Sequence, residues 1–383
     1  TVSNSIKADG GNAGTYNGSA IAGNGVAGAS TGGIGGSTGV SAVFSSKLGN
    51  GGAGGKLTFN HVGNLNINQP LSANGGTASS AGATAGNGGS VINNNATGGA
   101  GGSVSNGGTA GNGGIITLVA DGYNAFAPSV AAMGGDLLGS TAAAGTGGKG
   151  QSGITVNGGA GGNIGNMGSA GAGGKISITA TGSGFTNIFS ELNVRGGDAG
   201  TQNVNTTGLT GAGGDANNGG AGGKGGSIGS AASGGQGGSI SFIATKNGNI
   251  TTSTAGGRMV ARGGHAGTFA GFTGAGGSSL GGGAGKGGDS GSSASTNGNA
   301  GDGGSLLIQV NNGVSQIIVN GFDLSGGTGT TFQLQTGAGG NGGTDPGSTG
   351  GNSGAILGSV GNGGKGGIFD FKASGAAKLN LSS

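Results

Sequence analysis

Very few side chains in this sequence could act as catalytic acids, bases or nucleophile partners. Among 383 residues there are two histidines, His61 and His265, and a single glutamate, Glu191. A nucleophile–base–acid set needs a histidine brought together with a carboxylate. His61 ends a strand-like segment, whereas His265 follows a Gly-Gly pair, so the two histidines have unlike contexts. The sequence therefore predicts surface or turn histidines, no catalytic residues, and a protein that is not an enzyme.

The aspartates are scattered along the chain rather than paired. Glycosidase chemistry requires two carboxylates that face one bond, and the sequence shows no such pair. Asp136 and Asp198 share one position, directly after a Gly-Gly pair, which we interpret as a turn-forming polar position. The same position elsewhere holds Asn12, Thr77 or His265. Asp9, Asp302 and Asp345 are further examples of the scattered acids.

No motif indicates a cofactor, a metal or a nucleic acid. The chain has no cysteine, which excludes disulfides and thiolate metal sites. The formal net charge is only +3, and no basic cluster could follow a phosphate backbone. No apolar run is long enough to span a bilayer. No phosphate-binding loop is predicted at Lys149, Lys286 or Lys365, because each follows a glycine but precedes another glycine instead of Ser or Thr.

Several Asn-x-Ser/Thr sequons could accept glycans in an exported protein. The chain is rich in Asn, Ser and Thr, so several such matches are expected by chance, and we favour that interpretation. Such sequons begin at Asn17, Asn95, Asn205 and Asn249.

One pattern recurs along the whole chain: a Gly-Gly-x-Gly-Gly run, a short alternating strand, a second short strand, another Gly-Gly pair and a long glycine-rich arm. The first strands open as KLTF, IITL, KISI, SISF, SLLI and IFDF. They begin at residues 56, 115, 175, 239, 305 and 368, so the intervals are 59, 60, 64, 66 and 63 residues. Self-similarity at a nearly fixed period predicts a repeat architecture.

The ends of the sequence divide this repeat. The segment from Ser5 to Gly11 resembles a second strand without a first, and the segment from Ile368 to Ser383 contains a first strand without its partner. We divide the chain into a half-unit 1–55, units 56–114, 115–174, 175–238, 239–304 and 305–367, and a half-unit 368–383.

Three interpretations of the divided ends stay open. Neighbouring chains complete each other head to tail, or the chain is an excerpt of a longer array, or the phase is accidental. Head-to-tail contacts that do not close into a ring form filaments. Under the first interpretation, the assembly residues are Ile6, Ala8, Gly10, Gly11, Ile368, Phe369, Phe371, Leu379 and Leu381.

The glycine arms have a period of three residues. From Gly159 to Gly174 every third residue is glycine, which matches the polyproline-II helix with three residues per turn. Because that helix has no internal hydrogen bonds, its amides must pair with adjacent segments or with water. Flexible loops are the alternative. Single apolar residues in the arms predict pegs that fill a thin core: Val104, Ile164, Ile228, Leu280 and Ile356.

The fold class that follows is an all-β solenoid of about six units near 63 residues, each with two stacked strands and polyglycine-II-like arms, without helices. The segments GGAGGKISITA, GGQGGSISFIAT and AGNGGIITLVA resemble repeats of bacterial surface proteins of the filamentous-haemagglutinin or autotransporter type. That resemblance implies parallel β-helices. The period-three arms resemble the polyglycine-II bundles of some phage tail-tip adhesins.

These features favour a structural homopolymer, an extracellular filament or sheath whose only partner is itself. The alternative is a stalk section of a secreted adhesin at the cell surface, with cell-surface or matrix glycans as partners. Its recognition element would be the arm with Phe269 and Phe272, although we expect both to be core pegs. Ice binding would need regular threonine rows, which are missing. A β-helical polysaccharide lyase would rest on fold analogy alone.

Overall fold

The computed structural model describes most of the chain, and all structural statements below refer to those residues. They are 5–13, 16–19, 49–78, 81–91, 97–104, 106–126, 129–150, 155–182, 186–188, 190–205, 211–246, 250–252, 258–293, 298–311, 315–319, 321–329, 331–357, 359–375 and 377–381.

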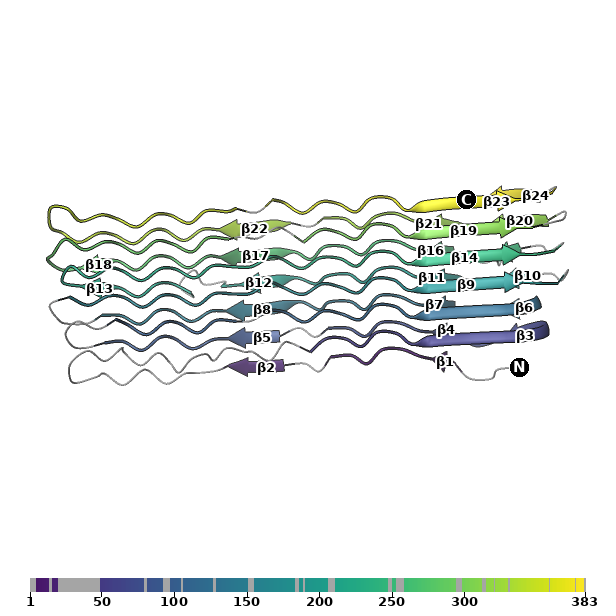
Figure 1. Ribbon diagram of the computed structural model, residues 1–383, viewed down its shortest axis with the longest axis horizontal. Helices are drawn as coiled ribbons and strands as arrows, with labels where there is room; N and C mark the ends of the chain where they lie inside the picture. Colours follow the sequence, from purple (N-terminus) through teal and green to yellow (C-terminus); the bar gives the residue numbers. More distant parts are fainter. Residues whose placement is uncertain are drawn as a thin grey trace.

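The described strands stack in parallel into long flat sheets. Two six-stranded sheets, a ten-stranded sheet and a two-stranded sheet are formed, and the described residues contain no helix. Figure 1 shows the result as an elongated slab in which equivalent segments lie one above another. The chain therefore has the all-β, parallel, solenoid-like fold that the repeat predicted. We call the stretch that supplies one strand to each six-stranded sheet a rung.

Two columns of strands lie at one end of the slab. The first column begins at the predicted residues and consists of β3 (Lys56–Ile67), β6 (Ile115–Phe126), β9 (Lys175–Ala180), β14 (Ser239–Ala244), β19 (Ser305–Val310) and β23 (Ile368–Ala373). The second column consists of β1 (Ile6–Lys7), β4 (Leu71–Ser72), β7 (Ser129–Ala131), β11 (Glu191–Asn193), β16 (Arg258–Val260) and β21 (Phe322–Asp323).

Three further sets of strands were not predicted from the sequence. Short strands that follow the first column complete the ten-stranded sheet: β10 (Thr186–Ile188), β15 (Ile250–Thr252), β20 (Ser315–Val319) and β24 (Ala377–Leu381). A third column lies inside the arms: β2 (Tyr16–Ser19), β5 (Ala81–Thr84), β8 (Ser140–Ala143), β12 (Gln202–Val204), β17 (Phe269–Phe272) and β22 (Phe332–Gln335). A two-stranded pair is formed by β13 (Ala216–Asn217) and β18 (Ser279–Leu280).

The main apolar core lies between the first and second columns. Alternation along the first strands buries every second residue, as at Ile176 and Ile178 of β9. Because the strands pair in register, Ile176 lies between Ile116 and Ile240 in the sheet. Burial of each such side chain stabilises the fold by about 1.5–3 kcal/mol. The core is therefore a ladder of like side chains that only stacked rungs can form.

A second, thinner core lies under the third column of strands. The predicted pegs Val104, Ile164 and Ile228 are buried there, together with Phe269, whose ring stacks on Phe332. Phe269 is therefore a core residue rather than an exposed recognition element. The prediction that Leu280 fills this core was wrong, because Leu280 is 51% exposed in β18.

The glycine arms are joined by hydrogen bonds from rung to rung and from layer to layer. An outgoing arm follows each second strand, and a returning arm leads to the next first strand. Glycine amides of one arm donate to glycine carbonyls of the other at 2.7–2.9 Å. These bonds form an unbroken series through Gly11, Gly52, Gly76, Gly111, Gly135, Gly171, Gly197, Gly235, Gly264, Gly301, Gly327 and Gly364.

This series leaves no space for a side chain. A Cβ atom on Gly135 would overlap the carbonyl oxygen of Gly76 in the rung below. Gly11 occupies the equivalent place in the first described rung, and a Cβ atom there would meet nothing within 4 Å. The requirement for glycine therefore comes from the neighbouring rung and not from the backbone conformation of the arm.

We predict that Gly135→Ala destabilises the fold by about 3 kcal/mol, because overpacking against fixed backbone costs this order of free energy. The matched substitution Gly11→Ala should leave the stability of a single chain within a few tenths of a kcal/mol of wild type, or raise it slightly. Denaturant unfolding of the two variants checks this expectation. Equal destabilisation by both would contradict the steric account.

Candidate functional site

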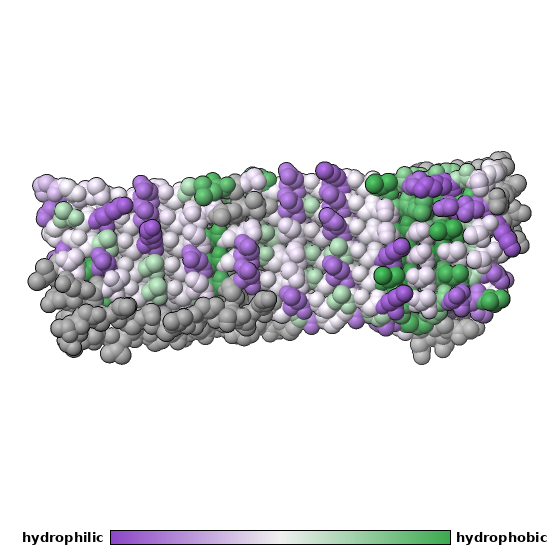
Figure 2. All heavy atoms as spheres, viewed as in Figure 1, coloured by the Kyte–Doolittle hydropathy of each residue, from purple (hydrophilic) through white to green (hydrophobic). Residues whose placement is uncertain are grey.

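The exposed face of the glycine arms carries repeated columns of polar side chains. The side-chain oxygen of a residue in one rung accepts the backbone N–H of the equivalent residue in the next rung. Asn50 Oδ1 accepts the N–H of Thr109, and Asn112 Oδ1 accepts that of Ala172, both at 2.9 Å. Figure 2 shows hydrophilic side chains in rows across the stack, separated by pale glycine-rich bands. We call these columns acceptor ladders.

The position after the Gly-Gly pair belongs to such a ladder. Asp136 Oδ1 accepts the N–H of Asp198 at 2.9 Å, and Asp198 Oδ1 accepts that of His265 at 2.8 Å. The His265 ring continues the series, since its Nδ1 accepts the N–H of Thr328 at 2.9 Å. These residues lie in extended arms, so the turn interpretation was wrong. Their common property is a side-chain acceptor that satisfies the next rung.

One arginine pairs with two neighbouring carboxylates in this ladder. Arg195 lies 2.8 Å from a carboxylate oxygen of Asp198 and 3.5 Å from one of Asp136. All three side chains are partly exposed, so solvent screens these ion pairs. The structure thus places Asp136, Asp198 and His265 in one column. The carboxylate oxygens of the two aspartates face backbone amides and Arg195.

The ladder bonds also affect ionisation. The backbone N–H of Asn352 donates to Asp289 Oδ1 at 2.9 Å, and this bond holds the pKa of Asp289 below its ordinary value, with smaller contributions from Lys286 and Lys224. A lowered carboxyl pKa gives stability that is present above the ordinary pKa and is lost as the pH falls through the lowered value. Asparagine at a ladder position has no such dependence on pH.

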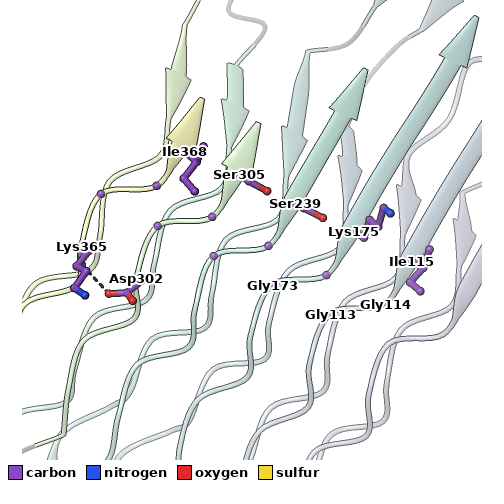
Figure 3. Close-up of a pocket in the computed structure, with 17 residues that line it drawn as sticks. Gly113, Gly114, Ile115, Gly173, Lys175, Ser239, Asp302, Ser305, Lys365 and Ile368 are labelled. Carbon is purple, nitrogen blue, oxygen red and sulfur yellow. Dashed lines mark hydrogen bonds between the residues drawn. The ribbon is translucent and has the colours of Figure 1, made fainter. Parts of the chain in front are cut away.

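An open groove crosses the rungs where the returning arms enter the first strands. Its volume is about 620 Å³ and its floor consists of Gly-Gly pairs from successive rungs. Figure 3 shows this floor, with the N–H of Lys365 bonded to Asp302. The side chains beside the floor are of three different types along the stack: Ile115, Lys175, Ser239, Ser305 and Ile368. The groove therefore presents no repeated recognition element.

The remaining histidine and the single glutamate lie apart from the ladders. His61 is exposed in β3, and Glu191 of β11 accepts a hydrogen bond from Asn193 at 2.8 Å. The part of the chain that the structure describes holds no group of three or more His, Cys, Asp or Glu able to bind a metal. Within the same part, no helix has the length and apolar character needed to cross a membrane.

The buried position of Asn205 argues against glycosylation of that sequon in the folded chain. Asn205 is 1% exposed; its Oδ1 accepts the N–H of Ala144, and its Nδ2 donates to the carbonyl of Phe272. Asn17 lies in β2, and Asn95 and Asn249 lie outside the described residues.

The predicted assembly residues form two groups that belong to the first and last described rungs. Ile6 and Ala8 pack at the edge of the main core, with Gly10 and Gly11 directly after them. In the last rung, Phe369 and Phe371 of β23 are partly buried, whereas Ile368 is 67% exposed. Leu379 and Leu381 of β24 are described by their backbone pairing, with Ile317 and Val319 respectively.

Comparison with known proteins does not assign the chain to a family. No family model, no curated protein and no solved structure matches the chain. Functional inference therefore depends on the residues and contacts described above.

We predict that Asn112→Ala destabilises the arms by about 0.5–1 kcal/mol, because the N–H of Ala172 loses a hydrogen-bond acceptor. Amide exchange at Ala172 should become faster. Asn112→Asp is the matched control, since a carboxylate oxygen can accept the same bond, and exchange should stay slow. Unchanged exchange in Asn112→Ala would show that the ladder does not protect the arm.

Proposed function

We propose that this chain is a non-catalytic structural subunit of an extracellular filament or sheath, in which copies stack head to tail. The observation that carries this proposal is the directional bonding between rungs. One face of every rung offers a set of donors and acceptors that differs from, and is complementary to, the set on its other face.

The repeating unit that supports this proposal is finer than the sheets alone. We infer about six rungs near 63 residues, whose arms adopt the polyglycine-II conformation. The period of three in the arms supports this conformation. Consecutive arm amides also have different partners: Gly51 donates to Thr109 in the next rung, and Gly52 donates to Gly11 in the other layer. A helix with three residues per turn presents successive amides in three directions in this way.

The two faces of the stack differ in their free backbone groups. In the covered rungs, the N–H of Gly263 donates to Ser325 and that of Gly303 donates to Lys365, always toward the later rung. The equivalent amides of the last rung, Gly326 and Gly366, have no partner among the described residues. In the covered rungs, the acceptor is the residue directly before the Gly-Gly pair of the next rung. In a second copy, the corresponding acceptors would be the carbonyls of Asp9 and Ala53.

Apolar side chains on the last rung are exposed where their equivalents are covered. Ile228 and Ile356 both bridge to Ser293, yet Ile228 is 1% exposed and Ile356 is 47% exposed. Leu357 and Val360, nearby in the same arm, are 72% and 69% exposed. This exposed apolar surface at the end of the stack favours a copy of this chain as the occupant of the face.

Glycine positions on the two faces provide a test that separates assembly from folding. A Cβ atom added to Gly11 or to Gly366 would meet no atom within 4 Å, whereas a Cβ on Gly303 would overlap the carbonyl of Leu324. By equivalence with the covered rungs, a methyl group on Gly11 would overlap Gly327 of a copy stacked on the first rung. A methyl group on Gly366 would overlap Ala8 of a copy stacked on the last rung.

We predict that the purified chain forms filaments with an axial step near 29 Å, since about six rungs repeat at about 4.8 Å each. Gly11→Ala and Gly366→Ala should both abolish filaments while leaving the unfolding midpoint of the single chain unchanged. Electron microscopy and denaturant unfolding supply the two readouts. Short monodisperse rods from the wild-type chain would overturn the proposal and favour a section of an adhesin stalk.

A further inference from the structure

Two covered Asn-Gly steps, at Asn50 and Asn87, are each held at two points by one residue of the next rung. The Oδ1 of Asn50 accepts the N–H of Thr109 at 2.9 Å, and the N–H of Gly51 donates to the carbonyl of the same Thr109 at 2.9 Å. The step at Asn87 and Gly88 is held in the same way by Thr146, at 2.9 Å and 2.8 Å. Both the side-chain carbonyl and the following backbone nitrogen are therefore engaged.

These are the two groups that react when asparagine deamidates. The glycine nitrogen attacks the asparagine Cγ, a reaction that glycine favours because it is conformationally free and carries no side chain. The new N–Cγ bond replaces the Cγ–Nδ2 bond, and ammonia leaves with the proton of the glycine amide. Water then opens the succinimide to aspartate or isoaspartate, so the reaction needs no oxidant or reductant.

Asn362 and Gly363 form the same dipeptide in the same column as Asn50, but in the last rung. Asn362 is anchored from below, because its N–H donates to Asn299 Oδ1 at 2.9 Å and its carbonyl accepts the N–H of Ala300 at 3.0 Å. Asn362 and Gly363 are both exposed. The Asn362 side chain and the Gly363 amide have no partner among the described residues.

We propose that Asn362 is a site of spontaneous deamidation through Gly363, and that the clamp from Thr109 protects the equivalent Asn50. The two steps share dipeptide and column, and Asn50 is itself exposed to water. They differ in the rung above, which clamps Asn50 through Thr109 and is missing at Asn362, and in the rung below, which anchors only Asn362. Stacking thus protects the asparagines of the covered arms from deamidation, and the uncovered rung deamidates first.

The two products have different consequences for a ladder. Aspartate already occupies the neighbouring column, where Asp302 Oδ1 accepts the N–H of Lys365 at 2.8 Å, so conversion to aspartate keeps the acceptor. Isoaspartate adds a carbon to the backbone and shifts the three-residue spacing on which the arm depends. Deamidation at Asn362 would therefore add negative charge to the open face and, as isoaspartate, disturb its register.

The test uses the 383-residue chain at a dilution at which size-exclusion chromatography shows single copies. The chain is incubated in mildly alkaline buffer, and deamidation is followed over time by peptide mapping with mass spectrometry. Asn362 should convert at least about tenfold faster than Asn50, because the reaction at Asn50 must first break two hydrogen bonds. Succinimide and isoaspartate should appear at Asn362. Equal rates at the two sites would overturn the proposal.

A second comparison tests the clamp at Asn50 whether or not copies stack. Thr109→Pro removes the N–H that holds Asn50 Oδ1, while proline keeps the backbone angle suited to an arm with three residues per turn. Deamidation at Asn50 should rise severalfold in Thr109→Pro and stay at the wild-type rate in Thr109→Ser, which keeps the N–H. An unchanged rate in Thr109→Pro would show that the clamp gives no protection.

Discussion

The structure depends on one constraint: the backbone amides of extended glycine segments have no partners within their own segment. A buried amide without a partner costs free energy comparable to a lost hydrogen bond. In this protein the partners come from the layer opposite and from the next rung, as in the bonds of Gly135 with Gly111 and Gly171. A single rung could not satisfy them. Stability is therefore a property of the stack, as in other repeat proteins.

The composition follows from the same constraint. Glycine is required where arms approach closely, and small polar residues are required where an arm faces water and must supply an acceptor to the next rung. This accounts for 113 glycines beside only 7% charged residues. Apolar side chains gather where strands face each other in the main core, and where the third column of strands faces the apolar pegs of the returning arms. Several aspartates are ladder members, and Arg195 is a counter-ion to two of them.

The sequence alone predicts the period, the first strands and the parallel stack, because alternating residues such as Ile176 and Ile178 carry a clear signal. It does not predict the third column, since strands such as Ser140–Ala143 are short and lack large apolar residues. The ladder role of Asp136, Asp198 and His265 was also missed. That role depends on contacts between rungs about 60 residues apart, although the recurrence of acceptor side chains at one position was a usable signal.

Amide hydrogen exchange across the whole chain tests the central claim most directly, because it compares the glycine arms with the strands in one experiment. Amides of covered arms, such as Gly135 and Gly197, should exchange as slowly as those of β9, since all are bonded between rungs. Amides of the last rung at Gly326 and Gly366 should exchange rapidly in dilute single copies. Rapid exchange throughout the covered arms would mean that they are flexible loops, and would contradict the account.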